Sequence, residues 1–289
     1  MFFNLGVFLT SMEKGVIYTP QEQQRVILPL LKKLHQWHQS GKTLVVGIQG
    51  GQGTGKTTLV RLLEEILHSA GYAAVSFSLD DFYTPWKERR ALQQKYPHNP
   101  FYHISRGLPG THRVQLLKKV LGALKRGKNA EIPRFDKSLH QGAGDVLKKK
   151  RKIRERQDFV LFEGWCVGIP PLSASELQRI CRKQGIPLDH MDPTGKHQQV
   201  VLRFLKHYQP AWAQMDRLIQ LQPDSSGFHL QWRLQQEKEL REKKRGGMSP
   251  QEVKRFTEPY LPFTYACYEK VKPDVKILIN KEHTLYAME

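Results

Sequence analysis

The sequence feature that most constrains the fold is a glycine-rich turn between an apolar run and a helical pattern. Residues 44–48 are apolar and rich in β-branched side chains, which predicts a buried strand. The turn then reads G-x-x-x-x-G-K-T from Gly50 to Thr57, and apolar residues recur on one helical face from Leu59 to Leu67. Strand, turn and helix in this order are the context that a P-loop requires.

The residues of this loop predict a binding site for ATP. Glycines allow backbone N–H groups to approach phosphate oxygens, and the start of the helix adds the positive end of its dipole. Lys56 would reach the β- and γ-phosphates, and the Thr57 hydroxyl would ligate Mg²⁺. A chance glycine turn is the alternative, and the correct flanks on both sides argue against it. The predicted nucleotide-binding residues in the loop are Gly50, Gly51, Gln52, Gly53, Thr54, Gly55, Lys56, Thr57 and Thr58.

Composition indicates a cytoplasmic enzyme. The chain has 289 residues, enough for one large domain or two small ones, and no clear linker divides it, so we expect a single domain over 1–289. No apolar run approaches the roughly 20 residues that cross a bilayer. Residues 1–19 read as a flexible extension without signal-peptide features, and Met12 is a second candidate start. Three cysteines without paired spacing fit a reducing compartment.

The formal net charge of +19 suggests polyanionic ligands, including nucleic acid or phosphorylated molecules. Much of this charge lies between Lys148 and Arg156, where seven of nine residues are basic. A solvated linker or helix face is the favoured interpretation, and nuclear localisation or RNA contact is the alternative. No aromatic residues interleave with these charges, so a stacking platform for single strands is not expected.

Further apolar runs predict the other strands of a parallel sheet and place acids at their ends. Residues 73–79 lead to Asp80 and Asp81, and residues 158–164 deliver Glu163 in a Walker-B-like arrangement. Residues 217–221 and 276–280 read as two more strands. We therefore expect an α/β chain with the P-loop NTPase three-layer fold, a central parallel sheet, a helical lid and insertions.

The segments between these strands predict two insertions and a lid. Residues 82–113 lack helical periodicity until Val114 and form the first insertion, and residues 172–210 form the second. Residues 228–247 read as a helix with a dense charge pattern, ending at two glycines. Its arginines could close over a nucleotide, or they could belong to a solvated helix.

Several motifs together resemble one group of kinases. In chain order they are GGQGTGKTT, SLDDFYTP, RGLPGTH, IPRFDKS with GAGD, FVLFEGW-VG, and WRLQ-E followed by GMS. This set, spanning positions 50 to 250, resembles the D-glycerate 3-kinase family within the phosphoribulokinase/uridine kinase/pantothenate kinase group of P-loop kinases. The resemblance implies a kinase that uses ATP and Mg²⁺ to phosphorylate a hydroxyl of a small molecule, with D-glycerate as a candidate.

The resemblance also implies roles for individual residues. Asp80 corresponds to the catalytic base, with Asp81 as a less favoured neighbour, and it is also a candidate metal ligand beside Thr57 and Glu163. Lys56 and Arg233 are the expected catalytic cations, and Arg241 is a second lid arginine that would contact the nucleotide. The implied acceptor-binding residues are Asp81, Tyr83, Arg106, His112, Arg134, Asp136 and Lys137.

Three segments depart from the family pattern near the expected acceptor site. Arg113 stands where the family has an acid, residues 142–146 lack two arginines, and the basic run replaces a tryptophan-containing connector. The acceptor therefore stays open, and so do two other functions: a nucleic-acid-linked kinase or ATPase, and a regulatory ATP-binding protein. The sequence does not predict an oligomeric state.

Overall fold

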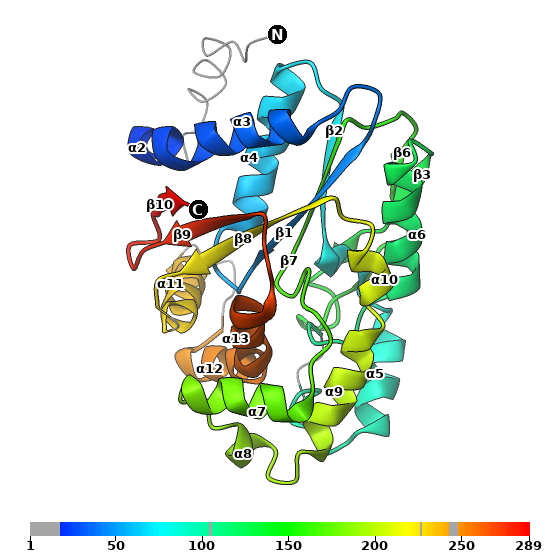
Figure 1. Ribbon diagram of the computed structural model, residues 1–289. Helices are drawn as coiled ribbons and strands as arrows, with labels where there is room; N and C mark the ends of the chain where they lie inside the picture. The colour runs from blue at the N-terminus through cyan, green and yellow to red at the C-terminus, as the bar shows by residue number, and fades with distance from the viewer. Residues whose placement is uncertain (1–17, 104–105, 226, 243–247) are drawn as a thin grey trace.

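The computed structural model describes residues 18–103, 106–225, 227–242 and 248–289. A central sheet of six strands runs through this part of the chain (Figure 1). Five strands are parallel and the edge strand β10 is antiparallel, so the predicted parallel sheet is confirmed and gains an edge strand that was not predicted. In spatial order the strands are β10 (Leu285–Met288), β9 (Val275–Ile279), β8 (Arg217–Pro223), β1 (Leu44–Gly50), β7 (Phe159–Gly164) and β2 (Ala74–Ser78).

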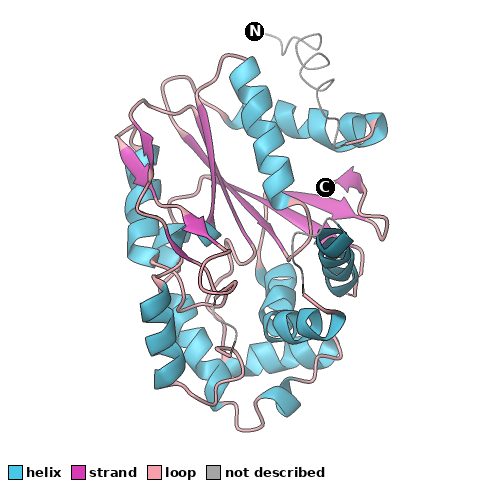
Figure 2. Ribbon diagram, turned by 180° about the vertical axis from the view of Figure 1, so that it is seen from behind, coloured by secondary structure: helices cyan, strands magenta, loops and turns pink. Residues whose placement is uncertain are grey.

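Helices cover both faces of the sheet, which confirms the three-layer fold (Figures 1 and 2). Alternate residues of β1 point to opposite faces, so Val46 packs with the helices of one layer and Val45 with those of the other. The first layer contains α2 (Pro20–Glu22), a π-helical turn (Gln23–Ile27), α3 (Leu28–Trp37) and α4 (Lys56–Ser69). The second core cluster includes residues of α6 (Val114–Lys125), α7 (Ala174–Lys183), α8 (Leu188–Met191), α9 (Lys196–Lys206), α10 (Gln209–Trp212) and α13 (Leu261–Lys270).

Short elements complete the structure around the carboxyl ends of the strands. Two small antiparallel pairs join β3 to β6 and β4 to β5. Their bounds are β3 (Ala130–Ile132), β4 (Phe135–Asp136), β5 (Asp145–Val146) and β6 (Arg151–Ile153). The remaining helical segments are a 3₁₀ turn (Leu79–Phe82), α5 (Trp86–Lys95), α11 (Phe228–Glu242), α12 (Pro250–Thr257) and a second 3₁₀ turn (Glu258–Tyr260).

Two sequence predictions are wrong in this region. Residues 83–111 were expected to lack helix, yet they contain α5; most of its side chains are at least partly exposed, with Arg89 buried, so it carries no apolar stripe. The basic run is neither a linker nor a helix face over its whole length, because Arg151–Ile153 forms the strand β6 against β3. Charged strands of three residues give no detectable alternation in a sequence.

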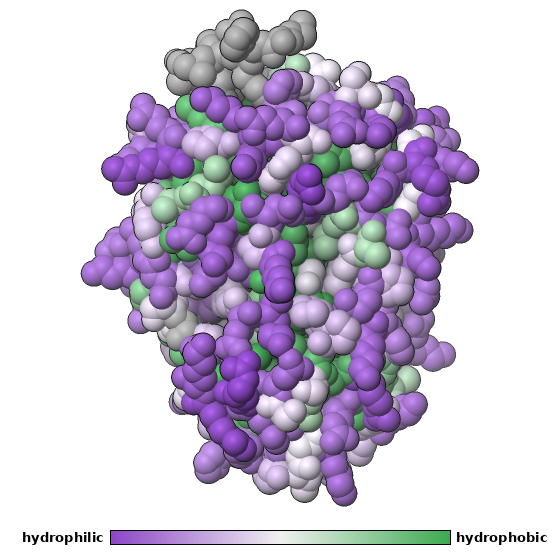
Figure 3. Space-filling model, in the orientation of Figure 1, coloured by the Kyte–Doolittle hydropathy of each residue, from purple (hydrophilic) through white to green (hydrophobic). Residues whose placement is uncertain are grey.

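The described part of the chain begins at Tyr18, directly before α2. Residues 1–17 of the predicted extension, with Met12, lie outside the described residues, whereas Tyr18 is buried and Thr19 caps α2. The face in Figure 3 is mostly hydrophilic, with apolar residues showing between charged ones. Among the described residues, no helix combines the length and the apolar character that crossing a bilayer would require.

Candidate active site

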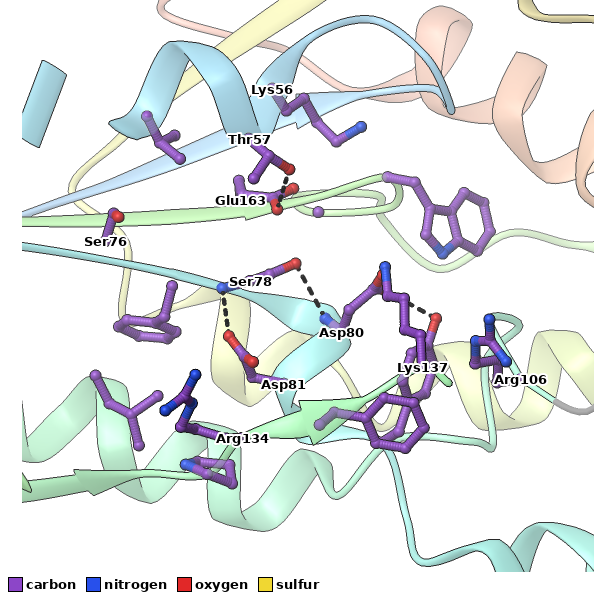
Figure 4. A pocket seen from close by; sticks show the side chains of 18 of the residues that line it. Lys56, Thr57, Ser76, Ser78, Asp80, Asp81, Arg106, Arg134, Lys137 and Glu163 are labelled. Carbon is purple, nitrogen blue, oxygen red and sulfur yellow. Dashed lines mark hydrogen bonds and ion pairs between the residues drawn. The ribbon is translucent and has the colours of Figure 1, made fainter. Parts of the chain in front are cut away.

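A cavity of about 770 Å³ opens at the carboxyl ends of β1, β7 and β2 (Figure 4). The P-loop forms one wall of it. Gly53 (φ 78°) and Gly55 (φ 83°) adopt left-handed backbone conformations that side chains disfavour, and α4 begins directly afterwards at Lys56. The Gly51 carbonyl accepts hydrogen bonds from Lys56 Nζ at 2.8 Å and from Thr54 Oγ1 at 2.9 Å. These bonds hold the loop in a curved shape directly before a 14-residue helix, α4.

Some of the predicted nucleotide-binding residues line the cavity, and the others shape the loop or the start of α4. Gln52, Gly53, Lys56 and Thr57 line the cavity. Burial lowers the pKa of Lys56, while the carboxylates of Glu163 and Asp80 act against that shift. The other predicted residues shape the loop or the first turn of the helix without lining the cavity: Gly50, Gly51, Thr54, Gly55 and Thr58.

Side chains of α11 and α13 hold the loop from behind. The hydroxyl oxygen of Tyr268 accepts the Gly51 N–H at 2.7 Å and lies 3.0 Å from His229 Nε2, and His229 Nδ1 lies 2.9 Å from the Gln52 carbonyl. The two rings stack with an interplanar angle of 4°. Burial lowers the pKa of His229 to about 4, although its bond to Gln52 opposes the change. Sequence reasoning missed both residues because no local motif links them to the loop.

Thr57 and Glu163 form an oxygen pair at the junction of β1 and β7. The Thr57 hydroxyl donates to Glu163 Oε1 at 3.0 Å, and both side chains line the cavity. Glu163 pairs in register with Ile48 of β1, which places its carboxylate beside the P-loop. No group of three or more His, Cys, Asp or Glu side chains in the described residues forms a metal cage. A hydroxyl and a carboxylate, completed by phosphate and water oxygens, are ligands that fit Mg²⁺.

Two adjacent aspartates at the end of β2 have different surroundings. Asp81 Oδ2 accepts the Ser78 N–H at 3.1 Å and closes a capping box around the 3₁₀ turn, while Ser78 Oγ accepts the Asp80 N–H at 3.2 Å (Figure 4). Burial raises the pKa of Asp81, and the nearby Asp80 and Glu163 carboxylates add to this effect despite the Ser78 bond. The Asp81 side chain takes part in the capping box, whereas the Asp80 side chain makes contacts across the cavity.

Asp80 is a carboxylate held by two donors. Its Oδ2 lies 2.5 Å from Lys137 Nζ, and its Oδ1 accepts the Tyr83 hydroxyl at 2.9 Å. Burial by itself would raise the pKa of Asp80, but Lys137, His112 and the Tyr83 hydroxyl outweigh it and bring the pKa down to about 2. Asp80 is therefore ionised near neutral pH.

Three basic residues share the cavity with this carboxylate. Arg106, Arg134 and Lys137 line the same cavity (Figure 4). Arg106 donates to the Gly142 carbonyl, and its own carbonyl accepts the Tyr260 hydroxyl at 2.8 Å. The arrangement gives the cavity a cationic wall suited to an anionic acceptor.

Two of the implied acceptor residues do not line the cavity. Asp136 accepts bonds from Ser138 N at 2.8 Å and Oγ at 2.6 Å, and so holds a turn. His112 lies behind Tyr83, with ring centroids 4.5 Å apart, and its Nδ1 is 2.7 Å from the Tyr208 hydroxyl. Burial lowers the pKa of His112 to about 4 against the pull of Asp80, so the ring is neutral near pH 7.

The two lid arginines have different positions. Arg233 lines the cavity, forms an ion pair with Glu237 and packs over the Phe256 ring at 5.6 Å. Arg241 does not line the cavity, and its guanidinium donates to the Met248 carbonyl. Residues 243–247 of the predicted lid lie outside the described residues.

The cavity also contains residues that sequence reasoning did not assign to a site. Trp165 follows the Glu163–Gly164 strand end, and its Nε1 donates to the Gly107 carbonyl at 2.9 Å. Its position two residues after the Walker-B-like acid Glu163 was the available signal. The basic run contributes three more lining residues that were not predicted, Lys149, Lys150 and Arg151.

The parallel sheet, the P-loop and the Thr57–Glu163 pair beside it define the class of P-loop phosphotransferases. Residues 45–169 match the family model described as Phosphoribulokinase / Uridine kinase family. The chain is 37% identical to the uncharacterized kinase mug58 of Schizosaccharomyces pombe, over 82% of this chain and 84% of that protein. The chain therefore belongs to the phosphoribulokinase/uridine kinase family.

Two further relatives carry a more specific name. The chain is 32% identical to the chloroplastic D-glycerate 3-kinase of Arabidopsis thaliana over 78% of this chain, and spans 47% of that protein's length. The solved structure of D-glycerate 3-kinase from Cryptococcus neoformans superposes with a TM-score of 0.77 at 29% identity, covering 91% of this chain and 96% of that one. The chain is an ATP-dependent kinase with an alcohol group as acceptor, and no finding supports the nucleic-acid-linked or regulatory alternatives.

Proposed function

We propose that this kinase transfers the γ-phosphoryl group of ATP to a hydroxyl of D-glycerate. Two relatives bear the name D-glycerate 3-kinase. The observation that carries the proposal is the Lys137 ammonium, 2.5 Å from the Asp80 carboxylate and flanked in the cavity by Arg106 and Arg134. This wall would bind the carboxylate of a small hydroxy acid while the acceptor hydroxyl meets Asp80.

The proposed mechanism relies on position and charge. Asp80 accepts the proton of the attacking hydroxyl, and Lys56 and Arg233 neutralise the charge on the transferring group. Bound Mg²⁺, held by Thr57 and Glu163, would supply further charge neutralisation at the phosphate oxygens. Asp80 serves as the base rather than as a direct metal ligand, because the Lys137 ammonium beside its Oδ2 would repel a second cation. Lys137 and Tyr83 use one lone pair on each carboxylate oxygen, so lone pairs remain to accept the hydroxyl proton. Trp165 and Tyr260 help to exclude water from the cavity.

The proposed function also includes roles for the loop residues and Tyr83, one kinase domain and a cytoplasmic location. Gln52, Gly53 and the other loop residues hold the ATP phosphates, while Tyr83 orients Asp80. Residues 1–289 act as one kinase domain in the cytoplasm, and the acceptor is a small molecule. Three buried free cysteines agree with a reducing compartment.

An acceptor comparison tests the substrate. Purified protein, ATP and Mg²⁺ would be incubated with D-glycerate, L-glycerate, glycerol, uridine or pantothenate, and the phosphate esters identified by ³¹P NMR. We expect D-glycerate to exceed glycerol by about 10–100-fold in kcat/KM, because glycerol lacks the carboxylate for a charge-assisted bond. Equal use of glycerol, or phosphorylation of uridine or pantothenate alone, would overturn the assignment.

Lys137→Gln provides the matched control for this comparison. The glutamine keeps a polar side chain of similar reach but removes the cation. The preference for D-glycerate over glycerol should then fall toward unity while ATP binding is retained. An unchanged preference in this variant would separate Lys137 from acceptor recognition.

A further inference from the structure

A second cavity lies at the opposite ends of the central strands. It has a volume of about 510 Å³ and is formed where β1 and β8 begin, next to the C-terminal ends of α3 and α6. The P-loop follows the other end of β1, so the length of this strand separates the two cavities (Figure 1). None of the residues that line this cavity lines the active site.

Basic side chains dominate the walls of this cavity. Asp216 is the one acid among its lining residues, and the basic residues are Lys42, Lys125, Arg126, Arg156 and Arg217. They come from four segments far apart in the sequence, including the end of the basic run. Like charges gathered in a concave surface raise its positive potential, which favours anionic ligands.

Ion pairs balance only part of this charge. Lys125 Nζ lies 2.6 Å from Asp216 Oδ1, Arg156 pairs with Asp158 at 3.2 Å, and Arg217 lies 3.6 Å from Asp274. Within the described residues, Lys42 and Arg126 form no ion pair. The cavity therefore keeps an excess of two cations after its neighbouring carboxylates are counted.

Two glycines let exposed arginine side chains lie close to the backbone beside the cavity. A Cβ at Gly122 would lie 3.2 Å from Arg126 Nη1, so this helix glycine leaves room for the guanidinium. A Cβ at Gly127 (φ 65°) would lie 2.9 Å from Arg156 Cγ, and the closeness again depends on glycine.

An aromatic side chain completes one wall. The Arg217 guanidinium lies 5.5 Å from the centroid of the Trp37 ring, within the range of a cation–π contact. Trp37 is half-buried at the end of α3 and lines the cavity. The contact places a third guanidinium beside the aromatic wall of the cavity.

We propose that this cavity binds a compact small-molecule polyanion with at least two negative charges, either a phosphate ester or a polycarboxylate. Guanidinium groups offer paired N–H donors that match phosphate and carboxylate oxygens. The cavity volume suits a metabolite, and the cations surround a hollow rather than forming the long stripe that a nucleic-acid backbone would need. The site is independent of the identity of the phosphoryl acceptor.

Isothermal titration of the full-length protein at low salt, without divalent cations, tests the proposal with inorganic pyrophosphate as the first probe and citrate as the second. The wild type should bind two pyrophosphate molecules, one at the P-loop and one in the second cavity. The double variant Lys42→Glu/Arg126→Glu should lose one site by at least about tenfold in affinity, while Lys56→Ala loses the other. Stronger binding of pyrophosphate than citrate in the second cavity indicates a phosphate ester, and the reverse indicates a polycarboxylate.

Lys118→Glu is the matched control, because Lys118 is an exposed lysine on α6 that does not line the cavity. It should keep both sites. A thermal melt checks that the double variant is folded, and the milder Lys42→Gln/Arg126→Gln replaces it if the charge reversal unfolds the protein. A single pyrophosphate site in the wild type, two sites in the double variant, or an equal loss in Lys118→Glu would overturn the proposal. Tighter binding of a short single-stranded RNA than of either probe would also overturn it.

Discussion

Replacing Asp80 by asparagine separates the proposed base from the rest of the site. The amide keeps the shape of the side chain and can still accept the Tyr83 hydroxyl, but it loses the charge that attracts Lys137 and the ability to take a proton. General-base catalysis usually contributes about 10²–10⁴-fold. The pKa of about 2 makes Asp80 a weak base before the acceptor arrives, which favours the lower half of that range. We therefore expect kcat to fall about 10²–10³-fold, or about 2.7–4.1 kcal/mol in the activation barrier.

The adjacent aspartate supplies the control for this experiment. Asp81→Asn should weaken the capping bond to the Ser78 N–H and lower the free energy of unfolding by about 1 kcal/mol, with kcat changed less than about tenfold. Steady-state release of ADP would measure kcat, and a fluorescent ATP analogue would measure nucleotide affinity in both variants. The reasoning is refuted if Asp80→Asn keeps kcat within about threefold of the wild type, or if Asp81→Asn loses as much.

Substitutions at Thr57, Lys137 and Tyr268 test three separate parts of the site. Thr57→Val removes the hydroxyl at the proposed metal position, so the Mg²⁺ concentration for half-maximal activity should rise by at least about tenfold; an unchanged Mg²⁺ titration would exclude Thr57 as a ligand. Lys137→Gln should raise the pKa of Asp80, because the effect of burial on that pKa is then less strongly opposed. Activity that depends on ionised Asp80 is present above this pKa and is lost as the pH falls through it. The acid limb of the kcat/KM profile should therefore move to higher pH than in the wild type. Tyr268→Phe leaves the Gly51 N–H without its acceptor and should lower the free energy of unfolding by about 1–3 kcal/mol, measured by urea denaturation, with a higher KM for ATP; a wild-type denaturation midpoint and KM would show that the bond is dispensable.

The parts of the fold that the sequence predicted are those with strong local patterns. Strands β1 and β7 are buried along their whole length, and β2, β8 and β9 each contain buried apolar residues, so all five could be recognised in the sequence. Asp80 and Glu163 could be placed because the carboxyl ends of parallel strands meet at one edge.

The parts that could not be predicted depend on tertiary contacts or on short elements. Helix α5 buries Arg89 rather than an apolar stripe, and β6 has three residues of which two are exposed. Lys137 lines the cavity and its neighbour Asp136 does not, and the sequence does not predict this because a two-residue strand, β4, ends at Asp136 and a turn begins at Lys137. The difference between Arg233 and Arg241 depends in the same way on how α11 packs.

In the proposed mechanism, one site couples ATP cleavage to phosphorylation of a hydroxy acid. The most direct measurement follows both products in the same quenched samples, ADP by chromatography and the phosphate ester by ³¹P NMR, with D-glycerate as the acceptor. Transfer to the hydroxy acid should give equal molar amounts of ADP and phosphoglycerate at every time point, and Lys56→Ala should lose both. Release of ADP and inorganic phosphate with no ester, at a rate that D-glycerate does not change, would contradict it.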